Sequence, residues 1–231
     1  MGRMEPSARR LDLNATLGIV GMFLLGVFLT WFAIVALRVP LPADPIARKL
    51  TTTILQTIAV IVLPYLWAAK RLGLSPSRLG LNFRNVGRST LQGCGLYLIA
   101  LVTFMACRDD PLIYDHPIRH ADLGPALLLF LTMALHAAGT DLATRGFILL
   151  SLAEYSPVAF AIFVQNVAWV VGHLYEIKLF ANSLGLPIAA GMIVVTGLLG
   201  DVVALRTRNV VGLAIAHVFL NLMMVVFIRS L

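Results

Sequence analysis

Seven long apolar runs constrain the fold of this chain more than any other feature of its sequence. The hydrocarbon core of a bilayer is about 30 Å thick, and a helix that crosses it needs about 20 mainly apolar residues. The candidate spans cover roughly residues 17–37, 51–69, 90–107, 124–152, 157–176, 186–205 and 209–229. In lipid, a helix satisfies its own backbone hydrogen bonds. The sequence therefore predicts an all-α fold, a polytopic membrane helix bundle of about seven transmembrane helices.

The composition supports this fold class. Of the 231 residues, 59% are hydrophobic and 13% are charged. A typical soluble domain is about 45–50% apolar and about 25% charged. The composition therefore excludes a disordered chain, a coiled coil and almost any soluble enzyme.

The net charge of +7 does not indicate a nucleic-acid partner. The basic residues flank the apolar runs, where they act as topology signals and contact anionic lipid. Their distribution, with Arg3, Arg9 and Arg10 ahead of the first run, favours a cytoplasmic N-terminus. We expect a multi-pass integral protein of the lipid bilayer. A compact chain without targeting extensions fits the inner (plasma) membrane of a bacterium.

Ionisable residues are distributed unevenly among the spans. The first three spans carry none, whereas the last four carry His136, Asp141, Arg145, His173, Asp201 and His217. An ionisable group inside a membrane costs several kcal/mol unless it is paired or faces a cavity. We therefore divide the chain into residues 1–123, which supply packing helices and loops, and residues 124–231, which build a site.

Spacing sorts these residues into helix faces, because residues four apart point the same way. Asp141 and Arg145 are four apart and suit a neutralising ion pair. His217 and Asn221 are also four apart, and Asn221 can serve either the site or a hydrogen bond to a neighbouring helix. The three histidines lie on three different helices. We expect His173, His217 and Asn221 to face one polar cavity.

Three short motifs resemble those of the CPBP family, the CAAX-processing and bacteriocin-processing intramembrane endopeptidases also called Abi proteins. The stretch from Thr140 to Gly146 resembles motif one, Glu-Glu-x-x-x-Arg followed by Gly. Trp169-Val-Val-Gly-His173 resembles motif two, Phe-x-x-x-His. His217-Val-Phe-Leu-Asn221 resembles motif three, His-x-x-x-Asn. The resemblance covers about residues 124–225.

The resemblance implies an intramembrane peptidase of the glutamic type. In such enzymes the first Glu of motif one and the histidine of motif two activate a water, and the residues of motif three hold the oxyanion. His173 would then act on the water, while His217 and Asn221 would donate to the oxyanion. The implied substrate is a membrane-anchored peptide or protein, and no metal or other cofactor is implied.

Motif one departs from the family pattern at its first position, where Thr140 stands in place of Glu. A threonine hydroxyl can orient water but cannot act as a carboxylate base. Asp141 is a carboxylate, but it lies about 100° further around the helix and is the natural partner of Arg145. We keep Asp141 among the catalytic candidates and count Thr140, Arg145 and Trp169 as supporting residues.

Two other residues could fill the role of the absent glutamate. His136 lies one helical turn before Thr140 and is a further supporting candidate. Glu176 lies three residues after His173. It could form a histidine–carboxylate dyad, or it could be a helix-end charge at the membrane surface.

Two other functions compete with a peptidase that has an altered base. The chain could be a catalytically inactive relative that acts as a membrane scaffold or binding protein. It could also be a transporter or metal-binding channel with His136, His173 and His217 as ligands, since three imidazoles suit zinc. The histidines form neither a His-x-x-x-His nor a His-Glu-x-x-His pattern, so we expect no metal.

Overall fold

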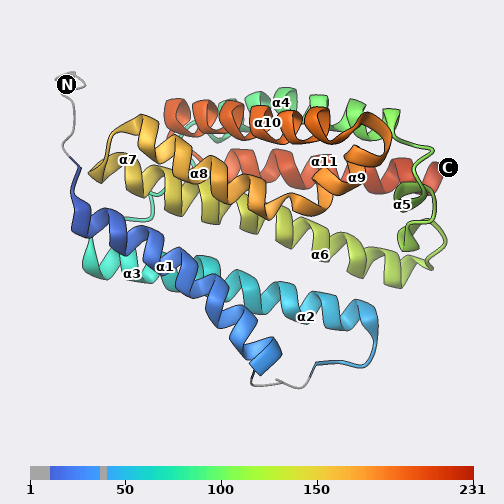
Figure 1. Cartoon of the computed structure of the whole chain (residues 1–231), viewed down its shortest axis with the longest axis horizontal. Coiled ribbons are helices and arrows are strands. Elements are labelled where there is room, and N and C mark those ends of the chain that lie inside the picture. The colour runs from blue at the N-terminus through green and yellow to red at the C-terminus, as the bar shows by residue number, and fades with distance from the viewer. Residues whose placement is uncertain (1–10, 37–40) are drawn as a thin grey trace.

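Every regular element in the described part of the chain is a helix (Figure 1). The structure is a computed structural model, and it describes residues 11–36 and 41–231. The all-α prediction is confirmed. Arg3, Arg9 and Arg10, which entered the predicted orientation, lie outside the described residues, as does the last residue of the first predicted span.

Six continuous helical stretches are long and apolar enough to cross a bilayer. Three of them contain π-helical segments, named η1, η2 and η4, in which the hydrogen bonds close over five residues instead of four. The six stretches are α1 (Leu13–Trp31) with η1 (Phe32–Ala36); α2 (Pro45–Thr57) with η2 (Ile58–Val62) and α3 (Leu63–Arg71); α4 (Val86–Ala106); α6 (Leu123–Asp141) with η4 (Leu142–Leu150) and α7 (Ser151–Tyr155); α10 (Leu186–Thr207); and α11 (Val211–Ser230). The short elements α5 (Pro111–Tyr114) and η3 (Pro117–Arg119) lie in the loop before α6.

The fifth predicted span is not one straight helix. It consists of α8 (Val158–Gly172) and α9 (Leu174–Leu184), which meet at His173 with a bend of 70°. The backbone N–H of His173 donates to the Val170 carbonyl, while the His173 ring nitrogen Nδ1 bonds the Trp169 carbonyl at 2.8 Å. In a continuing helix the Trp169 carbonyl would accept the bond from the His173 N–H. The side chain therefore takes the place of the backbone donor, and the helix ends.

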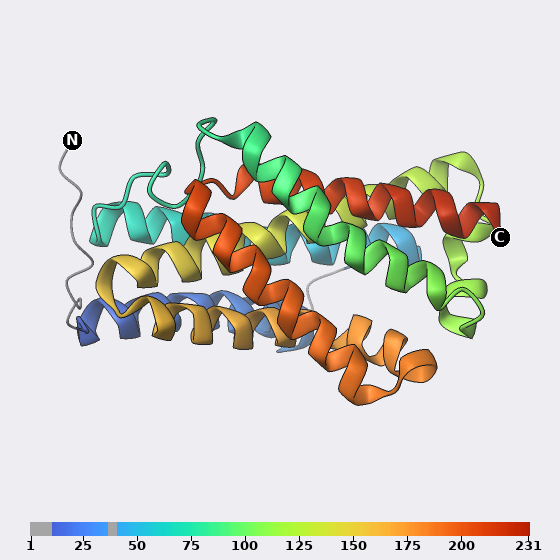
Figure 2. The ribbon, with the colours of Figure 1, turned by 90° about the horizontal axis from the view of Figure 1, so that it is seen from above.

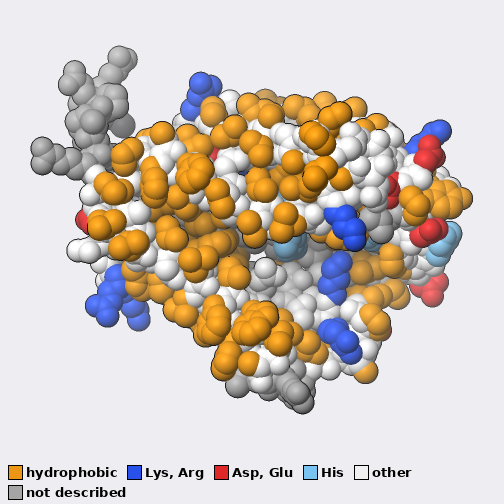
Figure 3. Space-filling view, in the orientation of Figure 1, with side chains coloured by type: hydrophobic (Ala, Val, Ile, Leu, Met, Phe, Trp, Pro, Cys, Tyr) orange, Lys and Arg blue, Asp and Glu red, His pale blue; other side chains and the backbone are white. Residues whose placement is uncertain are grey.

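The helices form three groups (Figures 1 and 2). One group consists of α1, α2 and α3 at one side of the bundle. The middle group consists of α6 and α8, and the third consists of α4, α10 and α11 on the opposite side. Hydrophobic side chains cover most of the face in view in Figure 3, as expected of a surface in contact with lipid. Together with the spans, this makes the chain a multi-pass integral membrane protein.

Small residues allow α4 and α11 to approach closely, as they do in other membrane helix pairs. A methyl group added at Gly93 would lie 2.8 Å from the Cβ of Ala216, and one added at Gly212 would lie 2.6 Å from the Cβ of Ser89. This contact brings Tyr97 of α4 against His217 of α11, with a separation of 4.6 Å between ring centroids.

Candidate functional site

The site is built around the junction between α6 and η4. Asp141 is the last residue of α6, and Arg145 lies in the π-helical segment that follows. Segments of this kind occur frequently at functional sites of helices. Both side chains are fully buried, with no exposed area, and they form the ion pair that their four-residue spacing predicts.

Arg145 is held on several sides. Its Nε lies 3.6 Å from the carboxylate of Asp201 on α10, and its Nη2 donates to the Thr196 carbonyl at 3.3 Å. The guanidinium carbon lies 3.8 Å from the centroid of the Trp169 ring, which is a cation–π geometry. Gly200 of α10 packs directly against the guanidinium, because its missing side chain leaves the room that Arg145 occupies. The buried cation is therefore enclosed by acceptors, an aromatic face and backbone.

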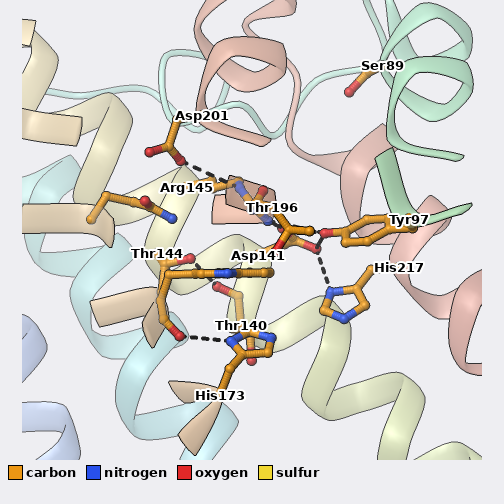
Figure 4. Close-up of polar contacts among 12 residues, drawn as sticks. Ser89, Tyr97, Thr140, Asp141, Thr144, Arg145, His173, Thr196, Asp201 and His217 are labelled. Atoms are coloured by element: carbon orange, nitrogen blue, oxygen red, sulfur yellow. Dashed lines mark hydrogen bonds and ion pairs between the residues drawn. The ribbon is translucent and has the colours of Figure 1, made fainter. Parts of the chain in front are cut away.

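Asp141 has two further partners besides Arg145 (Figure 4). The His217 Nδ1 lies 3.0 Å from Asp141 Oδ2, and the Tyr97 hydroxyl donates to the same oxygen at 3.1 Å. Asp141 thus links α6 to both α4 and α11. The link to Tyr97 corrects the interpretation of the first three spans as packing alone, because α4 supplies a polar group to the site.

His173 lies at the bend between α8 and α9, and its ring is close to two other site rings. Its centroid is 3.9 Å from that of Trp169 and 6.1 Å from that of His217, with the two imidazoles nearly parallel at 15°. A backbone carbonyl can only accept, so the Nδ1 that bonds the Trp169 carbonyl carries the hydrogen. The neutral ring therefore has its lone pair on Nε2, which is the atom that can accept a proton.

Asn221 is engaged differently from His217. Its amide nitrogen donates to the Met133 carbonyl of α6 at 3.1 Å. This is the hydrogen bond to a neighbouring helix that was one of the two uses expected for Asn221. One amide hydrogen is committed to that contact, and the role of Asn221 toward an oxyanion stays a prediction.

A cavity of about 440 Å³ lies between α1, α2, η2, α6, η4 and α8. Aliphatic side chains of α1 and α8 form much of its wall. The polar lining comes from two spans: Thr53, Gln56 and Thr57 of the second, and His136, Thr140 and Thr144 of the fourth. The lining also includes Gly172, the residue before His173. The cavity thus reaches both motif one and motif two.

Thr140 and His136 face this cavity one turn apart. The Thr140 hydroxyl donates to the His136 carbonyl at 2.9 Å, so its hydrogen is used within its own helix. Neither side chain belongs to the ion-pair network of Arg145. The supporting residues are therefore divided, with Arg145 and Trp169 in the buried network and Thr140 and His136 at the cavity.

The network contains three residues that the sequence analysis did not assign to the site. Tyr97 carries no charge and therefore gave no signal. Asp201 was recognisable as an ionisable residue within a span, but nothing in the spacing connects it with Arg145. Asn166 of α8 donates to Asp201 at 3.2 Å and had no pattern of its own.

The geometry does not favour the three-histidine metal site. Among the described residues, no group of three or more His, Cys, Asp or Glu side chains converges in a way that could hold a metal ion. His173 and His217 are near each other, but their Nδ1 atoms are already bound to the Trp169 carbonyl and to Asp141.

Comparison with known proteins agrees with the geometry. Residues 122–223 match the family described as type II CAAX prenyl endopeptidase Rce1-like. No curated protein and no solved structure matches the chain. The matched segment begins at α6 and contains all three motifs together with Arg145 and Asp201. By this segment, the chain is similar to the CPBP/CAAX protease family.

Proposed function

We propose that the protein is an intramembrane endopeptidase that cleaves a membrane-anchored peptide or protein, with Thr140 in place of the usual glutamate. The observation that carries the proposal is the pairing of His173 and His217. These side chains come from separate helices and lie 6.1 Å apart between ring centroids. Gly172, the residue before His173, lines the cavity between the membrane-spanning helices. The family is one of peptidases, so hydrolysis of a peptide bond is the reaction to test.

His173 acts on the attacking water in this proposal. The Trp169 carbonyl holds the hydrogen on Nδ1, so Nε2 presents its lone pair. A group that accepts a hydrogen bond from water in this way makes the water oxygen a better nucleophile toward a carbonyl carbon. The adjoining Trp169 ring fixes the orientation of the imidazole.

His217 stabilises the oxyanion in this proposal, with Asp141 as its positioning residue. A protonated imidazole donates from both ring nitrogens. Nδ1 can then hold the Asp141 carboxylate, 3.0 Å away, while Nε2–H donates to the developing negative charge. The second N–H of the Asn221 amide is available for the same purpose, since the first is bound to the Met133 carbonyl.

The aliphatic lining of the cavity suits a substrate that enters from the bilayer. A prenylated CAAX tail, a bacteriocin leader and a membrane-anchored sorting tail are the substrates that belong to this class. We assign the protein to the inner membrane of a bacterium, with the short loops between the spans as support.

The test is cleavage of these three peptides by the purified protein in lipid nanodiscs. We expect the wild type to cleave at least one of them, and His173→Ala to lower the rate about 10²- to 10⁴-fold, the contribution typical of a positioned acid–base group. His120→Ala is the matched control, because His120 is an exposed residue of the loop before α6. Equal rates for wild type and His173→Ala would overturn the proposal.

One observation favours a second function, that of a catalytically inactive membrane scaffold or binding protein. The position of the family glutamate holds Thr140, whose hydroxyl is bound to its own helix. This function predicts that the wild type binds a membrane-anchored peptide in the nanodisc without cleaving it.

A further inference from the structure

Glu176 is the acidic residue nearest in sequence to His173, and the bend at His173 decides where it lies. It sits in the first turn of α9, three residues beyond the point where the chain turns by 70°. Its side chain is partly buried, and Oε2 is buried without a hydrogen-bond partner among the described residues. A buried carboxylate oxygen without a partner is costly, so this atom calls for an explanation.

The charges around Glu176 come from the site and its rim. The carboxylate interacts electrostatically with His217 of α11 and with Lys49 of α2. Lys49 interacts in the same way with His136, which lines the cavity. Glu176 is therefore within electrostatic range of one histidine of the site, His217, and of the basic residue Lys49.

The surface of the molecule is hollowed next to α9, the helix that carries Glu176. Figure 3 shows a hollow in the face between α9 and α2, with a histidine inside it and basic side chains along one side. The basic residues of these two helices are Arg48, Lys49 and Lys178. The hollow thus has a histidine inside it and a cationic rim.

The other two carboxylates of the site belong to the network around Arg145, in which Asp201 Oδ1 forms an ion pair but no hydrogen bond among the described residues. Asp141 binds Arg145, His217 and Tyr97, and Asp201 is paired with Arg145 and accepts from Asn166. Either one could leave its partners only by stranding the buried guanidinium of Arg145. Glu176 can accept a proton at Oε2 without breaking any of these contacts.

We propose that Glu176 is the catalytic carboxylate of this protein and does the work of the glutamate that Thr140 replaces. The inference rests on the proposed peptidase function. As the oxygen of the attacking water bonds to the scissile carbonyl carbon, one of its protons passes to Glu176 and its other hydrogen is held by His173 Nε2. The proton on Glu176 then passes to the amide nitrogen as the C–N bond breaks. The products are a carboxylic acid and an amine, and Glu176 is again ionised.

A purely structural role for Glu176 makes a different prediction. Glu176 is the third residue of α9, a position where either Glu or Gln stabilises the start of a helix. A cap would therefore tolerate Glu176→Gln, whereas a proton acceptor would not.

The experiment measures peptide cleavage and thermal unfolding in nanodiscs, with the same prenylated, leader and sorting-tail peptides. We expect Glu176→Gln to unfold at the wild-type temperature and to cleave about 10²-fold more slowly or worse. Glu154→Gln is the control, because Glu154 of α7 is a partly exposed carboxylate that pairs with Arg208. We expect it to keep the wild-type rate. Adding Thr140→Glu to Glu176→Gln supplies a carboxylate at the family position and should bring the rate back to within about tenfold of wild type.

The outcomes separate the two proposals. If the wild type cleaves and Glu176→Gln cleaves equally well, this inference is overturned and the peptidase function stands. If the double variant folds normally but cleaves as slowly as Glu176→Gln, the inference that Glu176 does the work of the family glutamate is also overturned. If the wild type cleaves none of the peptides, the proposed function is overturned and this inference with it.

Discussion

The two sides of the helix formed by α6 and η4 differ in how completely their polar groups are paired. On the buried side, Asp141 and Arg145 have no exposed side-chain area and bind partners on α4, α8, α10 and α11. On the cavity side, His136 and Thr140 line an opening whose walls are mainly aliphatic. One stretch of chain thus carries both a closed network and an accessible surface.

The difference teaches which residues are available for chemistry. Breaking a buried ion pair leaves an uncompensated charge, so the residues of the closed network are committed to structure. Groups that react must have an atom free to accept or donate, and among the described residues such atoms include His173 Nε2, His217 Nε2 and Glu176 Oε2. We therefore expect substitutions of Asp141 and its structural partners to affect mainly stability, and substitutions of His173 and Glu176 to affect mainly rate.

The largest effect on stability is expected from Asp141→Ala. This change strands the buried guanidinium of Arg145 and removes the partner of His217, so it should lower the free energy of unfolding by about 3–5 kcal/mol. Asp141→Asn should cost less, because the amide oxygen still accepts from Arg145. Unfolding in detergent, followed by helical circular dichroism, measures both.

The control for this pair is Asp109→Ala. Asp109 pairs with Arg108 at 3.5 Å, but both side chains are largely exposed. An exposed pair contributes only about 0–1 kcal/mol. If Asp141→Ala proves no more damaging than Asp109→Ala, the buried side is not the closed network described above.

A smaller loss is expected from Gly200→Ala. The added methyl group would overlap the Arg145 guanidinium, and overpacking of this kind costs about 1–3 kcal/mol. Gly191→Ala in the same helix is the control, because a methyl group there meets nothing within 4 Å. Equal thermal unfolding temperatures for the two variants would show that α10 can move away from Arg145.

Tyr97→Phe should have a still smaller effect. It removes the hydroxyl that donates to Asp141 and keeps the ring stacked on His217. Loss of one such hydrogen bond costs about 0.5–1.5 kcal/mol. Tyr114→Phe is the control, since Tyr114 is half-exposed in the loop before α6. A variant that unfolds like wild type but cleaves far more slowly would instead place Tyr97 in the reaction.

The smallest effect is expected from Thr140→Val. The hydroxyl that it removes donates only to the His136 carbonyl, and valine keeps the shape of the side chain. Stability should change by no more than about 0.5 kcal/mol, and the cleavage rate should stay close to that of wild type. The rate is measured with the same peptides. A large fall would contradict the assignment of water activation to Glu176 without Thr140, and would indicate that the Thr140 hydroxyl binds the attacking water.

Much of the fold and part of the site follow from the sequence. Apolar length alone predicts the spans, because the thickness of the bilayer sets the length of a helix. The Asp141–Arg145 pair follows from a local spacing, and such spacings hold within one helix. The proximity of His173 and His217 was expected from their shared confinement within the membrane, and the structure brings their rings together.

The features that could not be predicted depend on relations between helices. Nothing in the sequence shows that Tyr97 of α4 meets Asp141, because that contact depends on how closely α4 and α11 pack. The bend at His173 depends on a side chain taking a backbone acceptor, and neither Gly172 nor His173 forbids a continuous helix. The sequence leaves two roles open for Asn221, because its hydrogen bond to Met133 depends on the position of α6.

The π-helical segment η4 has a consequence for how this chain should be compared with its relatives. Its hydrogen bonds close over five residues instead of the four of an α-helix, and Arg145 lies within it. An insertion or deletion of one residue between 142 and 150 can therefore be absorbed by widening or narrowing the helix, while the flanking faces keep their directions. Alignments that forbid gaps inside helices would misplace motif one by a residue in relatives that lack the wide turn. In such relatives, the choice between Thr140 and Asp141 as the counterpart of the first glutamate would have to be made in three dimensions.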